Sequence, residues 1–204
     1  MTNVRLFAVS TVIAVGAASV ACGAAPQPTV EAPPPETAPE AAALAPRRAP
    51  LEIGENAPDW SLDDDKGARR ALGALRTAGP VVVVFYQGSW CSTCREALGR
   101  FQQRAATFVE AGATLVAISA DPPEKSRRLG ESLTLSFPLL SDPQLEAIQG
   151  FGVVQAVGGL ALSAVFVIDT HGVIRWSQVG EDVPPDRVLD AVRALAAAPG
   201  DAAP

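Results

Sequence analysis

The chain has 204 residues, 48% hydrophobic and 19% charged, which is enough apolar material for one core or at most two small ones and excludes a wholly disordered protein. Its formal net charge of −6 argues against a nucleic acid as partner. Nucleic-acid binding proteins usually carry an excess of Lys and Arg, which neutralise phosphates and release their counterions. One histidine and three cysteines, which are not spaced as four zinc ligands, exclude a structural zinc site, and we expect neither a metal nor a cofactor.

The first 22 residues are typical of a secretory signal peptide. Arg5 precedes an apolar run over residues 6–21 that closes with small residues. At about 16 residues, this run is shorter than the roughly 20 that cross a bilayer as a helix, which disfavours a permanent transmembrane anchor. Cys22, followed by Gly23, resembles the lipidated cysteine in the lipobox of bacterial lipoproteins. We therefore expect export to the periplasm or cell envelope, with a lipid anchor to the membrane at Cys22.

Two other interpretations of Cys22 stay open. A lipobox has an aliphatic residue, usually leucine, three positions before the cysteine, and Ser19 stands there. Conventional signal cleavage after the small residues 18–21 is one alternative. The other is that Cys22 is an ordinary apolar residue of the signal, since signal regions tolerate cysteine.

Residues 23–50 are predicted to form a linker. Eight of the eighteen prolines fall between residues 24 and 50, mixed with alanine and glutamate. Proline removes backbone donors and favours an extended, polyproline-like chain, so no core can form here. Directly after a lipid site, such a semi-rigid spacer would hold a folded domain away from the membrane surface. That domain is expected over residues 51–199, followed by a disordered tail at 200–204.

The first half of the domain predicts a βαβ unit. It opens with a short strand at 59–62 and a short helix at 71–76. Residues 81–86 are then an unbroken run of β-branched and aromatic residues, typical of a strand buried on both faces. Apolar residues at spacings of three and four predict an amphipathic helix over 94–110. A second buried strand at 114–119 completes the unit.

The second half of the domain adds helices and a β-hairpin. Prolines at early positions, where no donor is lost, mark helix starts, and Asp142 is expected to cap one of them. Gly172 can supply the positive φ of the hairpin turn. The expected elements are a helix from 121–124 to about 133, an extended segment at 137–140, a helix at 142–150, hairpin strands at 164–168 and 173–176, and a helix from 184. Strands that alternate with helices in this way predict an α/β fold.

The strongest chemical signal is Cys91-Ser92-Thr93-Cys94, at the junction between the buried strand and the amphipathic helix. Residues i and i+3 of a helical turn lie about 5 to 6 Å apart, within the Cα separation that a disulfide tolerates. The pair can therefore open and close with little backbone movement. A helix N-terminus also supplies free N–H donors and a partial positive charge, which stabilise a thiolate and lower its pKa from about 8.5.

We expect Cys91 and Cys94 to be the catalytic pair. The first cysteine lies at or before the first helical turn and should be the more exposed, so Cys91 is expected to be the nucleophile and Cys94 the resolving thiol. The alternative is a purely stabilising disulfide in an oxidising compartment. A disulfide that closes a loop of only two intervening residues constrains the unfolded chain little and therefore stabilises the fold little. Stabilisation alone is thus a weak explanation for this pair.

Three neighbours of the dithiol are candidates for shaping the site. Trp90 and Tyr86 flank it and can form a shallow docking surface, although Tyr86 can equally be a strand residue with a satisfied hydroxyl. Arg95 directly follows Cys94 and can lower a thiol pKa, but an arginine on a helix surface is usually just solvated.

Six segments in chain order point to a known family. They are GENAPDWSL at 54–62, FYQGSWCSTC at 85–94, ISAD at 118–121, FPLLSD at 137–142, FVID at 166–169 and GVIR at 172–175. These segments resemble the thioredoxin-fold redoxins, specifically the peroxiredoxin-like AhpC/TSA family, here with a Cys-x-x-Cys site. The resemblance implies a thioredoxin-like α/β fold, a central mixed β-sheet flanked by helices, with the dithiol at the N-terminus of the first long helix.

The site departs from the peroxiredoxin pattern Pro-x-x-x-Thr-x-x-Cys. Laid over residues 87–94, the pattern puts the peroxide-attacking position on Cys94, with Gln87 in place of proline and Cys91 in place of threonine. Residues 158–164 contain neither the activating arginine of peroxiredoxins nor the cis-proline that thioredoxins place before the same strand. Without that threonine and arginine, the hydrogen bonds that would polarise a peroxide are missing. The site is a thioredoxin-type dithiol in a peroxiredoxin-like frame.

The leading hypothesis is a thiol–disulfide oxidoreductase with an extracytoplasmic redox or antioxidant role, in which Cys91 attacks a protein disulfide and Cys94 releases the mixed disulfide. The first alternative is a peroxiredoxin-like thiol peroxidase with Cys94 as the peroxidatic cysteine. The second is a catalytically silent redoxin-fold lipoprotein that acts as a binding module. Either enzyme needs a thiol electron donor as a partner, besides its protein disulfide or peroxide substrate.

Overall fold

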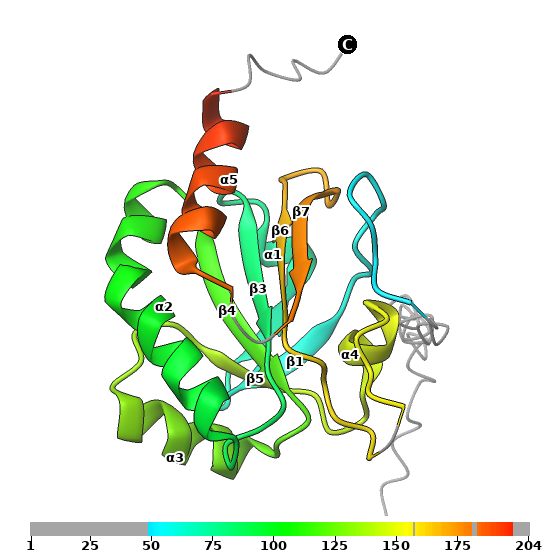
Figure 1. Ribbon diagram of the computed structural model, residues 1–204, viewed down its shortest axis with the longest axis vertical. Helices are drawn as coiled ribbons and strands as arrows, with labels where there is room; N and C mark the ends of the chain where they lie inside the picture. The colour runs from blue at the N-terminus through cyan, green and yellow to red at the C-terminus, as the bar shows by residue number, and fades with distance from the viewer. Residues whose placement is uncertain (1–48, 157, 181–182, 198–204) are drawn as a thin grey trace, which may run out of the picture. The chain divides into compact units, whose positions relative to one another are not determined.

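The computed structural model describes residues 49–156, 158–180 and 183–197 of the chain (Figure 1). The expected signal peptide with Cys22, the linker apart from its last two residues and the tail at 200–204 lie outside the described residues. In the part of the chain that is described, no helix is long and apolar enough to cross a membrane.

A mixed seven-stranded sheet forms the centre of the described fold, in the order β2-β1-β5-β4-β3-β6-β7. The strands are β1 (Ser61–Asp64), β2 (Arg69–Ala71), β3 (Val81–Phe85), β4 (Thr114–Ser119), β5 (Leu139–Ser141), β6 (Ala164–Ile168) and β7 (Ile174–Val179). β3 and β4 pair parallel, as do β4 and β5, and the other neighbours are antiparallel. The expected βαβ unit is therefore confirmed.

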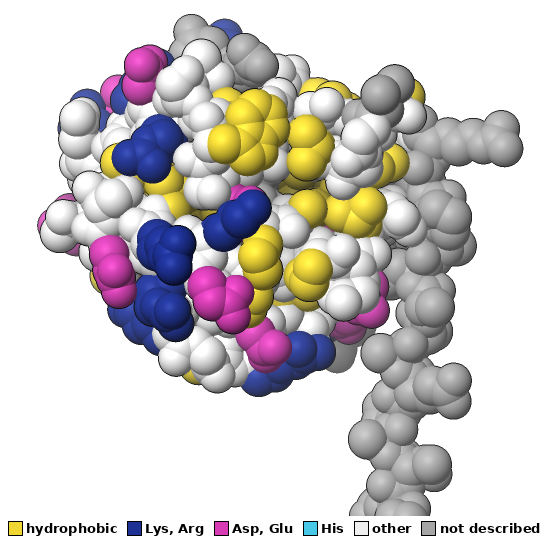
Figure 2. Space-filling view, turned by 90° about the horizontal axis from the view of Figure 1, so that it is seen from below, with side chains coloured by type: hydrophobic (Ala, Val, Ile, Leu, Met, Phe, Trp, Pro, Cys, Tyr) yellow, Lys and Arg dark blue, Asp and Glu magenta, His cyan; other side chains and the backbone are white. Residues whose placement is uncertain are grey.

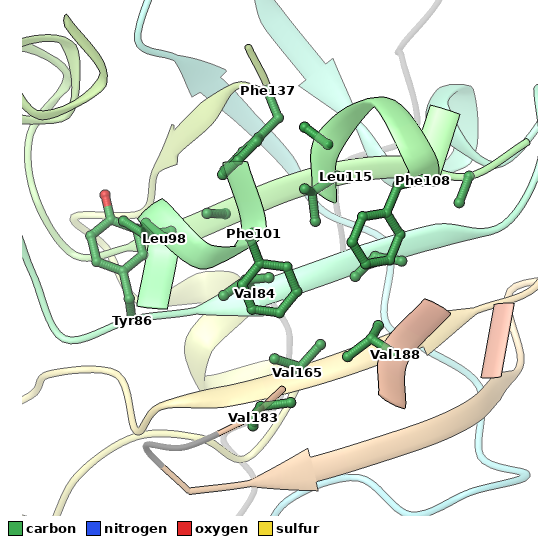
Figure 3. Packing of buried hydrophobic residues seen from close by; sticks show 14 of the residues in the cluster. Val84, Tyr86, Leu98, Phe101, Phe108, Leu115, Phe137, Val165, Val183 and Val188 are labelled. Atoms are coloured by element: carbon green, nitrogen blue, oxygen red, sulfur yellow. The ribbon is translucent and has the colours of Figure 1, made fainter. Parts of the chain in front are cut away.

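The strand β3 is buried on both faces, as its run of β-branched residues predicts. Successive side chains of a strand point to opposite faces of the sheet. Val82 and Val84 accordingly pack into one core layer, which we call the first layer (Figure 3). Val81, Val83 and Phe85 pack into the second layer. A single strand thus joins both halves of the core.

Helices cover both faces of the sheet (Figure 1). They are α1 (Leu72–Leu75), α2 (Ser92–Glu110), α3 (Pro123–Leu133), α4 (Glu146–Gly150) and α5 (Pro185–Ala197). The apolar faces of α2, α3 and α5 supply the first layer, with Leu98 and Phe101 of α2 over β3 (Figure 3). Leu72 of α1 and Ile148 of α4 belong to the second layer. This is the α/β arrangement with a helix-flanked mixed sheet that the sequence predicts.

The short strand β2 is an element that the sequence does not predict. Arg69 and Arg70 lack the apolar alternation by which a half-buried strand is recognised. The strand forms because β1 lies beside it across the turn at residues 65–68, with Leu62 opposite Arg70. The Arg70 Nε also donates to the Asp64 carboxylate at 2.9 Å, which ties the two strands of this hairpin together.

The helix expected to begin at Asp142 begins four residues later, at Glu146. The preceding Leu145 has a left-handed backbone, with φ of 62°, which separates a turn from the helix proper. The Asp142 carboxylate still accepts the N–H groups of Glu146 at 2.8 Å and Ile148 at 2.9 Å. Asp142 therefore satisfies early helix donors, as its predicted capping role requires, from outside the first turn.

We expect Phe151→Ala to lower the free energy of unfolding by about 3–5 kcal/mol, because it removes buried contacts and leaves a cavity. Phe151 is fully buried, and its ring centroid lies 5.1 Å from that of Phe85 and 5.0 Å from that of Phe166. Urea unfolding measures the change. The control is Val109→Ala on the exposed face of α2, with an expected change within about 0.5 kcal/mol. An equal loss in the two variants would contradict the prediction.

Candidate active site

The two cysteines of the described domain form a disulfide at the N-terminus of α2. Their Cα atoms are 5.2 Å apart, within the range of about 4.4–6.8 Å that disulfides adopt. Cys91 is the N-cap residue with an extended backbone, and Cys94 lies in the first turn. The structure thus brings together the two residues that the sequence predicts as the catalytic pair.

The sulfur of Cys91 is held by donors at the helix end. It accepts the N–H of Cys94 at 3.1 Å and lies 3.3 Å from the hydroxyl oxygen of Thr93. An N-cap position is usually filled by an oxygen-bearing side chain that accepts the same N–H. Once the disulfide is reduced, hydrogen bonds to the charged sulfur favour the thiolate of Cys91 over its thiol.

The two cysteines are almost equally buried, at 5% exposed for Cys91 and 4% for Cys94. This differs from the expectation that Cys91 is the more exposed. The reason is that the N-cap sulfur turns back over the helix end toward Cys94, instead of pointing into solvent. Exposure therefore does not assign the nucleophilic and resolving roles.

A small recess reaches one cysteine of the pair. It has a volume of about 20 Å³ and is lined by Cys94 and its helical neighbours Thr93 and Ala97, but not by Cys91. The remaining lining comes from two further residues of α2, from residues 84–86 at the end of β3, from residues 163–165 at the start of β6, and from Gly180 and Val183. A cavity needs about 10–15 Å³ to hold one water, so this recess accepts a molecule of about that size.

The lining of the recess is mostly apolar and contains no arginine. Hydroxyl groups come from Tyr86, Thr93 and Ser163. Ser163 belongs to the segment 158–164, where the sequence already lacks the activating arginine of peroxiredoxins. Hydroxyls are thus the side-chain donors that the described residues offer beside Cys94.

Tyr86 directly follows β3 and is buried beside the dithiol, in the same core layer as both cysteines. Burial raises the pKa of its phenol to about 12, a rise that the nearby Ser119 and Ser126 hydroxyls oppose, so the phenol stays protonated. Its oxygen has no hydrogen bond of good geometry among the described residues. Figure 3 shows the ring beside Leu98 with its hydroxyl directed away from Val165.

Trp90 and Arg95 lie on the outside of the same junction. Trp90 is 62% exposed, next to Cys91, and offers an apolar surface beside the dithiol. The Arg95 guanidinium instead reaches Ser132 at the end of α3, at 3.4 Å, which links α2 to α3. Its predicted effect on a thiol pKa stays a prediction.

Figure 2 views the molecule from below, where α2 begins in Figure 1, and shows hydrophobic side chains gathered beside charged ones.

Asp121 is a residue of the site that the sequence interpretation assigned only to a helix start. It follows β4 and is 7% exposed, and its Oδ2 accepts the N–H of Ser89 at 2.5 Å. Ser89 lies two residues before Cys91, in a turn closed by a hydrogen bond of 3.2 Å from the Cys91 N–H to the Gly88 carbonyl. The sequence did contain a signal for this contact. Asp121 follows β4, and β4 is parallel to β3, so the carboxylate lies at the same sheet edge as the segment that leads to Cys91. Among the described residues, no three metal-ligating side chains cluster.

The comparisons with known proteins show the family and the fold of the chain. The AhpC/TSA family matches residues 53–177. Alkyl hydroperoxide reductase E from Mycobacterium tuberculosis is 30% identical over 152 residues, which cover 72% of this chain and 99% of the relative. The crystal structure of the peroxidoxin BcpB from Mycobacterium tuberculosis is 32% identical, with a TM-score of 0.67, and the match covers 71% of this chain and 98% of that one.

More distant structures share the fold alone. AhpC from Enterococcus faecalis has a TM-score of 0.65 at 21% identity, and the match covers 74% of this chain and 98% of that one. The thioredoxin-like fold and the family resemblance expected from the sequence are both confirmed.

Proposed function

Since this chain belongs to the AhpC/TSA family, whose members similar to it are thiol-dependent oxidoreductases, we propose that it is a thiol peroxidase that reduces small hydroperoxides at Cys94. The observation that carries the proposal is the recess, which reaches Cys94 and not Cys91. Cys94 also occupies the cysteine position of the peroxiredoxin pattern over residues 87–94. Peroxidase chemistry thus takes the place of protein disulfide reduction as the leading hypothesis.

The first step oxidises Cys94. Its thiolate attacks one oxygen of the hydroperoxide, so that an S–O bond forms and the O–O bond breaks. The departing alkoxide or hydroxide takes a proton and leaves as alcohol or water. Cys94 becomes a sulfenic acid, a reversible oxidation state of cysteine. Thr93 and Ser163 line this recess, and we assign to their hydroxyls the donation of a hydrogen bond to the leaving oxygen.

The second step closes the disulfide. The Cys91 thiolate attacks the sulfur of Cys94, an S–S bond forms, the S–O bond breaks, and the hydroxide that leaves becomes water. The Cα separation of 5.2 Å already suits the product, so α2 can stay folded during this step. The Cys94 N–H on the Cys91 sulfur supports the thiolate that the attack requires.

The cycle ends when a thiol donor reduces the disulfide. One donor thiolate forms a mixed disulfide with the pair, and a second donor thiol releases it, which returns both cysteines to the reduced state. The exposed indole of Trp90 beside Cys91 gives such a donor an apolar contact. The donor can be a small thiol or a dithiol protein.

Reduction of protein disulfides is the second candidate function. It is favoured by the position of Cys91 as N-cap, because a stabilised thiolate is the attacking species in thiol–disulfide exchange. In this reaction Cys91 attacks the substrate disulfide, and Cys94 then displaces the substrate thiol. The two candidates differ in which cysteine attacks first, so single variants separate them.

We expect Cys94→Ser to lose peroxide consumption by more than about a thousandfold, because the attacking sulfur is gone. Cys91→Ser should keep it within about tenfold when dithiothreitol is in excess, since the donor can reduce the sulfenic acid directly. The assay is hydrogen peroxide consumption with dithiothreitol, run beside reduction of a protein disulfide on the same variants. Peroxide consumption that depends on Cys91 and not on Cys94 would contradict the proposal. Protein disulfide reduction lost in Cys91→Ser would support the second candidate.

The size of the recess predicts a preference among hydroperoxides. We expect kcat/KM for hydrogen peroxide to exceed that for cumene hydroperoxide by about tenfold or more, because a bulky group beside the peroxide cannot enter. Val183→Ala widens the recess and should reduce this ratio. Val192→Ala, which truncates a buried residue of α5 outside the lining, is the matched control. Equal ratios in the wild type and Val183→Ala would argue against recess-based selection.

The proposed site of action is outside the cytoplasm, on a membrane, with Cys22 as the lipid attachment point and residues 23–50 as the spacer. In a bacterium that processes lipoproteins, the wild-type protein is expected in the detergent-extractable membrane fraction. Cys22→Ser should move it to a soluble fraction, because the acceptor of the lipid is lost. Cell fractionation with mass spectrometry of the mature N-terminus measures both. Membrane association that persists in Cys22→Ser would contradict lipidation at this residue.

A further inference from the structure

We propose that Asp121 is a positioning residue that holds the loop before the dithiol and sets the reduction potential of the Cys91–Cys94 pair. The inference does not depend on which substrate is used, because peroxide and disulfide chemistry cycle the same disulfide. It rests on a contact between the end of β4 and the segment that leads from β3 into α2.

The contact joins two parts of the chain that are 32 residues apart. The Asp121 carboxylate accepts the backbone N–H of Ser89 at 2.5 Å. A Cβ placed on Gly88 would lie 3.4 Å from the same carboxylate oxygen and 2.7 Å from Nε1 of Trp90. The carboxylate is therefore packed directly against the turn that ends at Cys91.

Other buried carboxylates in the described domain have local structural roles. Asp64 accepts backbone N–H groups of its own turn and pairs with Arg70 at 2.9 Å. Asp169 does the same in the hairpin turn and pairs with Arg175 at 2.6 Å. Asp142 accepts N–H groups at the start of α4.

Asp121 differs from these three residues in what it binds. Its carboxylate accepts the N–H of Ser89, which is 32 residues away, whereas the other three accept N–H groups within six residues of themselves. Like Asp142, it forms no ion pair among the described residues. A buried carboxylate without a cation is costly unless hydrogen bonds satisfy it. The long-range contact indicates that this charge serves the loop and the dithiol.

The sign of the effect follows from electrostatics. The Asp121 carboxylate lies against Gly88 and Ser89, two to three residues before Cys91. A negative charge at this position opposes the Cys91 thiolate that the Cys94 N–H stabilises, and it therefore makes the reduced pair less stable relative to the disulfide. Removing the charge should favour the reduced form and raise the reduction potential.

Nearby ionisable groups on the packed elements do not cancel this effect. The Tyr86 phenol stays protonated, and the Arg95 guanidinium on α2 is turned to Ser132. Glu124 and Lys125 at the start of α3 are exposed, so solvent screens their charges.

The test separates the charge from the hydrogen bond. Asp121→Asn keeps an acceptor for Ser89 and removes the charge, and Asp121→Glu keeps the charge. Reduction potentials are measured by titration against glutathione with alkylation mass spectrometry. Asp121→Asn is expected to shift the equilibrium constant about tenfold toward the reduced form, which is about 30 mV for this two-electron couple. The pKa of Cys91 should fall in the same variant, and Asp121→Glu should stay near the wild type.

The matched control is Asp142→Asn, which neutralises a buried carboxylate at the end of the next strand whose hydrogen bonds go to α4 and not to the loop before Cys91. It is expected to lower the thermal midpoint without moving the potential. An unchanged potential in Asp121→Asn, or the same shift in Asp142→Asn, would overturn the proposal. If Asp121→Asn does not fold, Asp121→Ser is judged by the same criterion. If the Asp121 variants keep the wild-type reduction potential and still consume peroxide, the role of Asp121 is refuted and the peroxidase proposal stands.

Discussion

Every residue of β3 is buried, and this determines where the chain leaves the sheet and enters α2. The strand pairs with β4 on one side and β6 on the other, and a slip of one residue would exchange its two faces between the core layers. The loop after Tyr86 therefore reaches the start of α2 at a set position. There, the free N–H groups of the helix end meet the sulfur of Cys91. The core, rather than the short loop itself, holds the dithiol.

Elements whose apolar residues face the core could be predicted from the sequence alone. Residues 114–119 and 164–168 form β4 and β6 with the predicted bounds, because a strand buried on both faces reads as a continuous apolar run. The hairpin strand β2 and the start of α4 could not be predicted in this way. Their positions depend on a partner strand and on the left-handed backbone of Leu145, which no periodicity encodes.

The same division holds for the site. The Cys91–Cys94 pair could be predicted, because residues i and i+3 at the start of a helix are close in space whatever the rest of the fold does. The recess beside Cys94 and the contact of Asp121 were not, since both need segments far apart in the chain to meet. The exposure of the cysteines also depends on tertiary packing, which buries Cys91 almost as fully as Cys94.

The placement of both sulfurs in one helical turn has a consequence for oxidative damage. A cysteine sulfenic acid that meets a second peroxide molecule is converted to sulfinic acid, which most enzymes cannot reverse. In the proposed cycle, Cys91 lies three residues from the sulfenic acid of Cys94, at the N-terminus of the same helix, and can trap it within one turn of α2. Intramolecular trapping competes with the second oxidation independently of a partner or a conformational step. In the proposed cycle, such a site is suited to remain active at high oxidant load.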